Sequence, residues 1–591
     1  MLRCFMIQEK LKNSIREALK TLSITADDVH LEHPTDLNFG DYSSNAALAY
    51  AKELKIKPRE LAEKIAEEIR KKKIKEIEKI EVAGAGFINF FLSKEFFATS
   101  LSNAIKAGEN FGENESLKGK KIIIEYTDPN PFKEFHIGHL MSNTIGESLS
   151  RIIEFHGAEV KRACYQGDVG LHVAKAVLGM KTLRDLMPDD KATLTNRVKF
   201  LAMSYSLGSS SFSSLGDIDD FDRRVEGINK AIESGELKII NKKIYDRSDE
   251  EINKFYDWGK DVSLKYFGEI YKKLDTKFNF NFFESETGDF GKKIVEENLK
   301  NGVFEKSGGA IVFKGEKYGL HTRVFINSEE LPTYEAKELG LAKIKYDKYP
   351  YDVSIVVTGN EINDYFKVLL KAMEIVFPDL AEKTKHISHG MLRLPSGKMS
   401  SRTGDVITAE SLMADTQKLV EEKIKDRNYD EAMKKDIVEK VSIGAIKYSI
   451  LKHTTGSDII YDFDKSISFE GDSGPYLQYS YARAKSVLEK AKEEEIEPSA
   501  GKISSVETAE LERLLYRFPE IVERAGKEYS PHYIASYLIE LAGSFNGFYA
   551  KYKIVDANDE NSPYKVILTA AFAATMKNGL NLLGIQVPER M

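Results

Sequence analysis

Two histidines separated by two residues stand just after a short apolar run in the first third of the chain. The segment PFKEFHIGHLMSN, residues 131–143, carries His136 and His139 around Gly138. At the start of a helix, residues three apart share a face, and free backbone N–H groups and the helix dipole favour an anion. Two imidazole donors there suit a polyphosphate that gains charge in a transition state, and a glycine lets a purine approach the backbone.

Two other interpretations of this pair stay open on its spacing alone. Histidines in a bare H-x-x-H pattern commonly cap a helix or pack in a core. A zinc site is a further alternative, but no third ligand stands nearby at a recognised spacing. We therefore expect no tightly bound metal.

A second candidate for phosphate chemistry lies about 260 residues downstream. The segment LPSGKMSSRTGDV, residues 394–406, is a glycine-flanked basic loop that contains Lys398 and the hydroxyl residues Ser400 and Ser401. Such a loop can close over phosphates while its lysine neutralises their charge. The loop alone fits an ordinary flexible connection, but its pairing with the histidines in this order favours a shared site.

Hydrophobic patterns predict the elements that must position these groups. KKIIIEY, residues 120–126, is a continuous apolar strand of the kind found in a sheet covered on both faces. Helical spacing follows the histidines, so strand, loop and helix begin a βαβ unit. A similar arrangement returns at 352–377, where Pro378 ends the helix. The histidines thus lie beyond the carboxyl end of a parallel strand, where open α/β sheets bind ligands.

The chain divides into three predicted units. Residues 1–115 read as a small α+β domain, and residues 116–407 as a parallel-sheet α/β domain. An insertion is expected around 171–330, with a hairpin at 302–315. Residues 408–591 are amphipathic and poor in turns, which indicates an all-α domain. The predicted fold class is therefore multidomain α/β.

Composition limits the classes of protein that remain. The 591 residues are 30% charged and 42% apolar, and the net charge of -7 argues against indiscriminate coating of nucleic acid. No apolar run reaches membrane-spanning length, so we expect no membrane partner. Two cysteines, Cys4 and Cys164, cannot form a disulfide framework, which makes a reducing cytoplasm the simplest compartment.

The two motifs together resemble a known family. Residues 136–139 resemble the HIGH signature of class I aminoacyl-tRNA synthetases, and residues 398–402 resemble their KMSKS loop. The resemblance implies a Rossmann-like domain that activates an amino acid with ATP, which brings Mg²⁺, and then transfers it to the terminal ribose of a tRNA. The ATP-binding residues that it implies are His136, Gly138, His139, Lys398, Met399, Ser400 and Ser401.

One position departs from the usual loop, because Ser401 stands where a lysine is common. Lys133, three residues before the first histidine, is near enough to the same phosphates to compensate. Arginyl-tRNA synthetases commonly combine such a lysine with a degenerate loop, so the resemblance implies catalytic roles for Lys133 and Lys398 beside His136 and His139. The alternative is that Lys133 forms only a surface salt bridge, worth about 0–1 kcal/mol.

The match sharpens to the arginyl-tRNA synthetases over nearly the whole chain. Four separated stretches carry it, together with the terminal ERM: NFGDYSSNAALAYAKEL (38–54), EYTDPNPFKEFHIGHL (125–140), LPTYEAKELGLA (331–342) and ISFEGDSGPYLQYSYAR (467–483). The partners implied are L-arginine, ATP and tRNA(Arg). We expect a monomer, although the sequence does not determine the oligomeric state.

The resemblance assigns the substrate arginine to Glu125, Asn130, Tyr334 and Glu338. Chemistry agrees, because a guanidinium is a planar cation with fork-like donors that carboxylates match. Tyr334 and Glu338 are four apart, so a helix presents them on one face. Two alternatives stay open: Glu338 as an exposed residue paired with Lys337, and Asn130 as a turn former between two prolines. The family more often has aspartate at Glu338.

Tyr476, Tyr479 and Arg483 are the main tRNA-binding candidates, since splayed bases stack on aromatic and guanidinium planes. The alternative is a tyrosine-rich core seam. The resemblance adds Met591 near the anticodon and, through the N-terminal domain, Tyr42 and Asn45 at the tRNA elbow.

Two rival functions remain at this stage. A glutamyl, lysyl or cysteinyl enzyme of the same class is one, but a glutamyl pocket should be basic and a cysteinyl enzyme should show zinc-ligand cysteines. A tRNA-binding descendant without chemistry is the other, and the intact His136, His139 and Lys398 argue against it.

Overall fold

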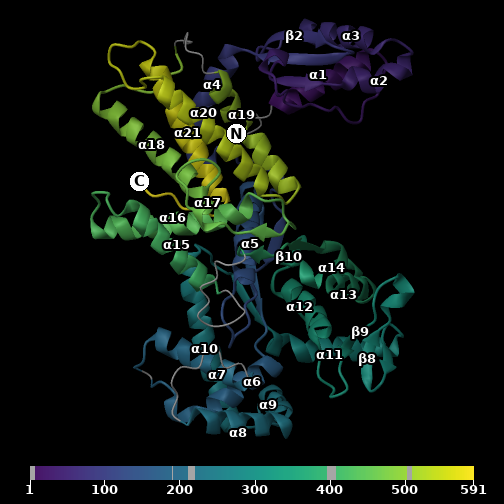
Figure 1. Cartoon of the computed structure of the whole chain (residues 1–591). Helices are drawn as coiled ribbons and strands as arrows, with labels where there is room; N and C mark the ends of the chain where they lie inside the picture. The colour runs from purple at the N-terminus through teal and green to yellow at the C-terminus, as the bar shows by residue number, and fades with distance from the viewer. Residues whose placement is uncertain (1–6, 190, 210–219, 396–407, 502–508) are drawn as a thin grey trace.

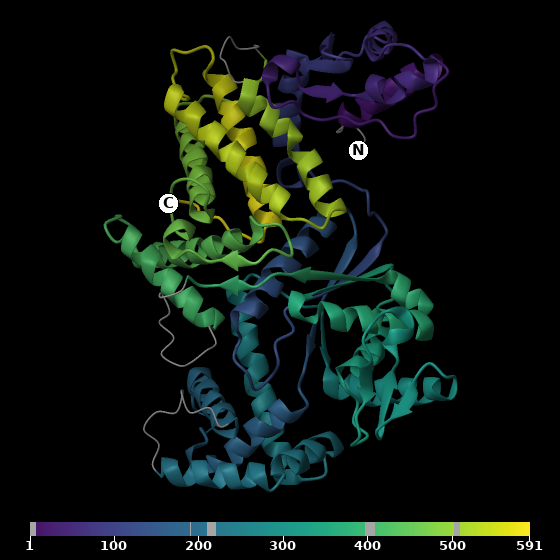
Figure 2. The same ribbon diagram turned by 45° about the vertical axis from the view of Figure 1, so that its right-hand side comes forward.

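The computed structural model describes residues 7–189, 191–209, 220–395, 408–501 and 509–591. Its ends differ in character: a small N-terminal unit and a helical C-terminal bundle lie at one end, and a separate group of helices, α6–α10, lies at the other (Figures 1 and 2). Among the described helices, none combines the length and the hydropathy needed to cross a membrane.

The N-terminal unit packs helices on a three-stranded antiparallel sheet with the order β1-β3-β2. Leu61, Ile65 and Ile69 recur every four residues along α3 and are fully buried, which fixes the face of this helix that meets the core. Its elements are α1 (Ile7–Thr21), β1 (Tyr42–Ser44), α2 (Ala46–Leu54), α3 (Pro58–Lys71), β2 (Ile77–Ala83) and β3 (Phe87–Leu92).

A five-stranded parallel sheet with the order β11-β10-β4-β5-β6 forms the centre of the molecule. Both predicted strands are confirmed and pair with each other as β4 and β10. The strand order reverses between these two, which creates a crevice at their carboxyl ends. The strands are β4 (Lys121–Glu125), β5 (Glu159–Gln166), β6 (Phe280–Phe283), β10 (Val353–Gly359) and β11 (Thr384–His389).

Helices connect these strands and cover the sheet. The helix predicted after the histidines is α5, and the one predicted to end before Pro378 is α13. The connecting helices are α5 (Ile137–Phe155), α11 (Glu284–Lys300), α12 (Tyr334–Lys348), α13 (Asn363–Val376) and α14 (Pro378–Lys383).

The span 171–330 is not one insertion, in contrast to the sequence-based expectation. Helices α6 to α10 separate β5 from β6, and then Phe280–Phe283 returns to the main sheet beside β5. A second, smaller excursion is an antiparallel sheet between α11 and α12, which includes the predicted hairpin. These elements are α6 (Leu171–Thr182), α7 (Leu194–Gly208), α8 (Phe221–Glu233), α9 (Glu236–Asp246), α10 (Glu250–Lys273), β7 (Glu305–Ser307), β8 (Ala310–Phe313) and β9 (Arg323–Ile326).

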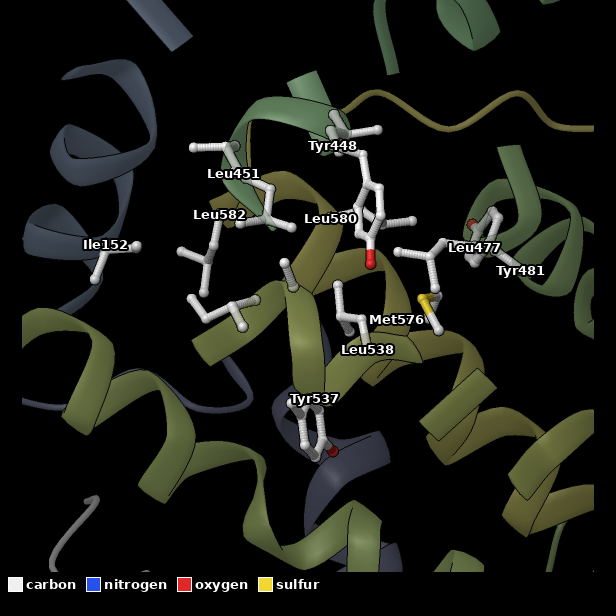
Figure 3. Close-up of a cluster of buried hydrophobic side chains, with 14 of the residues drawn as sticks. Ile152, Tyr448, Leu451, Leu477, Tyr481, Tyr537, Leu538, Met576, Leu580 and Leu582 are labelled. Atoms are coloured by element: carbon white, nitrogen blue, oxygen red, sulfur yellow. The ribbon is translucent and has the colours of Figure 1, made fainter. Parts of the chain in front are cut away.

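The C-terminal part is helical, as predicted, apart from the short pair β12–β13. Its core continues into the central unit: Figure 3 shows Ile152 of α5 at the edge of the buried cluster that contains Tyr448, Leu451, Leu580 and Leu582. The elements are β12 (Leu392–Arg393), α15 (Ala409–Ile424), α16 (Glu431–Leu451), β13 (Ile459–Ile460), α17 (Phe463–Ser466), α18 (Gly474–Glu493), α19 (Ala509–Lys527), α20 (His532–Lys551) and α21 (Ser562–Leu582).

Helix α4 (Lys94–Ala107) belongs structurally to this C-terminal bundle, although the sequence predicts it in the first unit. It packs against α19 and α21, and Leu101 and Ala104 are buried in the same core as those helices. The compact N-terminal unit therefore ends with β3 near residue 92, and the boundary expected at residue 115 falls beyond α4.

Candidate active site

The two histidines close the first turn of α5. His136 is the N-cap, and its Nδ1 accepts hydrogen bonds from the backbone N–H groups of Gly138 (3.1 Å) and His139 (3.4 Å). The His139 Nδ1 accepts from the His136 N–H at 3.2 Å, and the two rings stack with centroids 3.5 Å apart. The two histidines therefore do cap the helix, as the first alternative interpretation predicts. Because each Nδ1 accepts, the proton of each neutral ring lies on Nε2, which remains a donor.

Both imidazoles are held in the neutral form. Burial lowers the pKa of His136, and the Lys133 ammonium lowers it further. Burial lowers the pKa of His139 well below its usual range, and His136 and Lys133 act in the same direction. At neutral pH the pair therefore offers uncharged N–H donors beside the helix N-terminus rather than two positive charges.

Lys133 lies in a loop with an unusual backbone. Thr127, Asp128 and Phe132 all have positive φ values, 81°, 46° and 69°, and non-glycine residues adopt this region only where surrounding structure enforces it. Burial and the nearby Lys175 lower the pKa of Lys133. Within the described residues its ammonium makes no hydrogen bond or ion pair, so the surface salt bridge considered above is absent there.

Most of the second motif lies outside the described residues. Lys398, Met399, Ser400 and Ser401 lie outside the described residues, which stop at 395 and resume at 408. Thr408 forms an antiparallel bridge with His136, and the Ala409 N–H donates to the Phe135 carbonyl at 2.8 Å. Thr408 and Ala409, the first described residues after the second motif, therefore lie beside the first histidine.

A cluster of acidic side chains, here called the acidic pocket, lies at the same strand ends. Glu125, the last residue of β4, accepts from the Lys345 Nζ at 2.8 Å, and both side chains are buried. Glu338 lies close enough for the Glu125 charge to raise its pKa, after burial, to about 8. Among the described residues the Glu338 carboxylate has no hydrogen-bond or ion-pair partner, and Lys337 pairs elsewhere.

Glu284 completes this acidic pocket at the start of α11. It accepts from the Lys337 Nζ at 2.6 Å, and both side chains are 5% exposed. Its other oxygen lies 3.0 Å from the place where a Cβ on Gly167 would stand, and the Asn130 amide oxygen is closer still. A side chain at 167 would displace the Asn130 amide, and glycine leaves the room in which Asn130 and Glu284 converge. Tyr334 is 58% exposed, with its ring centroid 5.3 Å from the Lys337 Nζ.

Four of these residues were not predicted from the sequence. Glu284 follows a four-residue strand that gave no clear pattern, and Lys337 and Lys345 read as ordinary helix-surface charges. Asp128 accepts the Tyr165 N–H at 2.7 Å, and burial followed by the Glu125 charge raises its pKa well above the usual range. The sequence offers a signal for two of them, because Lys337 adjoins Glu338 and Asp128 lies two residues before Asn130.

One cavity, here called the α18 cavity, brings together all four residues predicted near the anticodon. Its volume is about 400 Å³, and its lining includes Tyr476, Tyr479, Arg483 and Met591. The Arg483 guanidinium carbon lies 4.7 Å from the Tyr479 ring centroid and 4.9 Å from that of Tyr549. An arginine between two rings, beside an open cavity, is a stacking surface for a flat base.

Tyr42 and Asn45 occupy different environments. Tyr42 is fully buried, and its hydroxyl donates to the Glu520 carboxylate of α19. It therefore joins the N-terminal unit to the C-terminal bundle and presents no ring to solvent, contrary to the expected contact with RNA. Asn45 is the partly exposed N-cap of α2. Phe39, at 49%, is an exposed aromatic ring of this region.

Three family models cover most of the chain. Residues 9–92 match the arginyl tRNA synthetase N-terminal domain, residues 100–463 the catalytic domain of class I tRNA synthetases (R), and residues 477–591 the DALR anticodon binding domain. The chain belongs to the arginyl-tRNA synthetase family. The catalytic model extends past residue 407, so the predicted central domain ends too early relative to that family model.

Individual relatives agree with this family assignment. The chain is 31% identical to an arginine–tRNA ligase of Clostridium acetobutylicum, over 95% of this chain and 96% of the relative. It is 30% identical to that of Ligilactobacillus salivarius, over 95% of both. Arginyl-tRNA synthetase structures from Thermus thermophilus and Plasmodium falciparum share its fold, with TM-scores of 0.76 and 0.78. Their identities are 23% and 22%, and 99% of this chain is covered in each case, with 100% and 99% of those chains.

Proposed function

We propose that the chain is an arginine–tRNA ligase, which uses ATP to form arginyl-adenylate and pyrophosphate and then transfers arginine to the terminal adenosine of tRNA(Arg). The observation that carries the proposal is the position of the acidic pocket. Glu125, Glu284 and Glu338 gather at the strand ends where two neutral histidines cap α5. A cationic amino acid in the pocket would therefore lie beside a polyphosphate at the helix N-terminus.

The pocket offers separate groups for the two cationic ends of L-arginine. We assign the α-ammonium to Asn130 and Glu284, whose oxygens converge at Gly167. The guanidinium falls to Glu125 and Glu338, because carboxylate oxygens match its fork of donors. Tyr334, exposed at the entrance, would cover the side chain. An uncharged amino acid would leave buried carboxylates unpaired, which gives strong discrimination.

Activation then requires alignment and charge stabilisation rather than a covalent enzyme intermediate. The arginine carboxylate attacks the α-phosphorus of ATP, and pyrophosphate leaves in line, with Mg²⁺ arriving on ATP. His136 and His139 donate from Nε2 to the phosphate oxygens as charge develops. Lys133 and Lys398 neutralise the polyphosphate. Gly138 leaves room for the nucleotide. Met399, Ser400 and Ser401 of the second motif complete the ATP site.

Transfer to tRNA uses the other end of the molecule as well. The adenylate acylates a terminal ribose hydroxyl, the 2′-OH for a class I enzyme, and tRNA binding precedes efficient activation. Tyr476, Tyr479, Arg483 and Met591 hold the anticodon at the α18 cavity. At the elbow, Asn45 remains a candidate, and the exposed Phe39 takes the stacking role first given to Tyr42.

The chain is further proposed to act as a monomer in the cytoplasm. All residues assigned to the acidic pocket and to the α18 cavity come from a single chain, so neither site needs a second copy. Light scattering of the purified chain, with and without tRNA, tests the monomer, and a dimer that is required for charging would contradict it.

The decisive experiment is amino-acid-dependent ATP–pyrophosphate exchange, measured with and without tRNA(Arg). Exchange is expected with L-arginine in the presence of tRNA, and not with lysine, glutamate or cysteine at matched concentrations. Exchange with another of these amino acids would reassign the substrate. No exchange with any of them, despite tight tRNA binding, would favour a binding protein without chemistry.

A further inference from the structure

Asp168, in the loop that follows β5, is a fully buried carboxylate outside the groups assigned so far. Its side chain is 0% exposed, and residues of two other elements donate to it. On α10, the Tyr256 hydroxyl lies 2.8 Å and the Lys260 Nζ 2.7 Å from Oδ2. On α11, the Ser285 N–H lies 2.9 Å from Oδ1 and the Ser285 hydroxyl 2.6 Å from Oδ2. A buried charge with this many donors fixes the relative positions of the elements that supply them.

These contacts place Asp168 where the N-cap side chain of α11 would normally act. The N-cap residue itself, Phe283, makes no side-chain cap hydrogen bond. An N-cap side chain ordinarily accepts from the N–H of the second or third helical residue, and Ser285 is the second residue of α11. A carboxylate also suits the positive end of the helix dipole. Asp168 therefore caps α11 from a different part of the chain.

Glu284 is the first residue of α11 and directly precedes the capped position. Its Oε2 accepts from the Lys337 Nζ at 2.6 Å. Its Oε1 has no hydrogen-bond partner among the described residues and lies 3.0 Å from the place where a Cβ on Gly167 would stand. Gly167 precedes Asp168, and its carbonyl oxygen is 2.9 Å from the His172 Nε2. One short loop thus lies against Glu284 and holds the helix turn that carries it.

We propose that Asp168, held in place by α10, is the positioning residue for Glu284: it caps α11 and so keeps the free Glu284 oxygen at the α-ammonium of bound L-arginine. The inference rests on the proposed function, which assigns that ammonium to Asn130 and Glu284. Asp168 is buried and acts through Glu284 rather than on the substrate. Because Tyr256 and Lys260 hold its carboxylate, the contact also joins the helices between β5 and β6 to the acidic pocket.

A purely structural role and a positioning role predict different results. If Asp168 only stabilises the fold, its loss should weaken every ligand of the pocket to a similar degree. If it positions Glu284, its loss should selectively weaken ligands that carry an α-ammonium. The probe is desaminoarginine, which has the guanidinium and the carboxylate of arginine but no α-amino group. The measured quantity, here called the ammonium preference, is the dissociation constant of desaminoarginine divided by that of L-arginine.

Calorimetric titration of the full chain with both ligands tests the proposal. The wild-type ammonium preference should be about a hundredfold, since two groups receive the ammonium and each charged hydrogen bond contributes about tenfold or more. In Asp168→Asn the preference should fall about tenfold, while the affinity for desaminoarginine changes less than about threefold. Asp261→Asn, which removes an exposed partner of Lys265 on α10, is the matched control and should change neither affinity. An unchanged preference in Asp168→Asn, or an equal loss for both ligands, would overturn the proposal.

Two further variants test the route from α10 to Glu284. Glu284→Gln should itself reduce the ammonium preference, and Asp168→Asn added to it should cause no further loss, because the carboxylate that Asp168 positions is already gone. Lys260→Met removes one donor to Asp168 and should lower the preference about threefold. Additive losses in the double variant would show that Asp168 acts independently of Glu284. An unchanged preference in Lys260→Met would contradict the part that α10 plays.

Failure of this inference can be distinguished from failure of the proposed function. If arginine-dependent ATP–pyrophosphate exchange occurs but Asp168→Asn keeps the ammonium preference, only the inference fails. If the chain neither binds arginine nor supports exchange, the proposed function fails with it. Should Asp168→Asn not fold, which thermal unfolding reveals, Ser285→Ala decides. That variant removes the hydroxyl bond to Asp168, keeps the backbone cap and should lower the preference about threefold, and no change would overturn the proposal.

Discussion

The acidic pocket and the α18 cavity, the two proposed recognition sites, differ in their composition. The first pairs nearly buried carboxylates with buried lysines, as in Glu125–Lys345 and Glu284–Lys337. The second is an open space of about 400 Å³, where Arg483 lies between aromatic rings. Buried charges penalise a wrong ligand by leaving themselves unpaired, whereas rings attract any flat base. On this proposal the acidic pocket excludes uncharged ligands, whereas the α18 cavity holds a base with little selectivity.

The two sites also differ in how the chain assembles them. Tyr476, Tyr479 and Arg483 come from the single helix α18, so their relative positions follow from helical spacing. The pocket joins the end of β4 to α11 and α12, which lie more than 150 residues later in the sequence. Damage to the pocket should therefore affect folding and chemistry together, and damage to the α18 cavity should affect RNA binding alone.

The largest expected effect is in the buried pairs. Glu125→Gln leaves Lys345 without a carboxylate, so the free energy of unfolding should fall by about 4 kcal/mol. Denaturant unfolding of the full chain measures this. The double variant Glu125→Gln with Lys345→Met should recover most of the loss, because both charges are then removed. Equal stability of the single variant and the wild type would show that the pair is not buried as described.

The second largest effect is expected for Lys133→Ala, in the rate of arginine activation. Removing a donor aimed at developing charge costs about 10²-fold in kcat, roughly 2.7 kcal/mol. ATP–pyrophosphate exchange should fall by that factor while the arginine dissociation constant changes less than threefold. Lys367→Ala, on the exposed surface of α13, is the matched control. Unchanged exchange in Lys133→Ala would remove the explanation for the serine at position 401.

Arg483→Ala should weaken tRNA binding by about 2 kcal/mol, since stacking on such groups is worth about 1–3 kcal/mol per base. The KM for tRNA in aminoacylation measures this effect, and the KM for arginine should stay constant. Lys490→Ala lies on the exposed side of the same helix and should bind tRNA normally. If the pocket and the cavity depended on each other, the arginine KM would change as well.

The smallest effect is expected at Tyr42. Tyr42→Phe removes a hydroxyl that donates to Glu520, a carboxylate that His33 also contacts at 3.0 Å. The loss should be about 1 kcal/mol in the docking of the N-terminal unit, seen as faster proteolysis between residues 92 and 121. Exchange with arginine should be unaffected. A large loss of tRNA affinity without faster cleavage would contradict this and would support a contact between Tyr42 and RNA.

The sequence predicts those helices and strands whose apolar residues follow a regular local spacing. The runs that became β4, α5, β10 and α13 carry continuous apolar stretches or helical stripes, and the histidine cap follows from position at a strand exit. The four residues FNFF of β6 are too few to show an alternating apolar pattern. The sequence therefore predicts one long insertion that wrongly includes this strand. Strand pairing with β5 decides that position, and pairing is not local.

The candidate site divides in the same way. The acidic residues Glu125 and Glu338 were found through resemblance and charge chemistry, but the lysines beside them were not. A buried Lys345 is indistinguishable in sequence from the exposed Lys343 two positions earlier, because burial depends on which helix face meets the sheet. Tyr42 shows the converse error, since a tyrosine placed at the surface proved to lie between two domains.

The position of α4 has a consequence for synthesis on the ribosome. This helix is made early, yet the α19 and α21 surfaces that bury Leu101 and Ala104 emerge about 400 residues later. At ordinary translation rates that interval lasts tens of seconds, during which the side of α4 that carries Leu101 and Ala104 stays uncovered, although Phe97 of the same helix packs in the N-terminal core. The nascent chain should therefore need chaperones to cover this helix until the last segment of the chain leaves the ribosome.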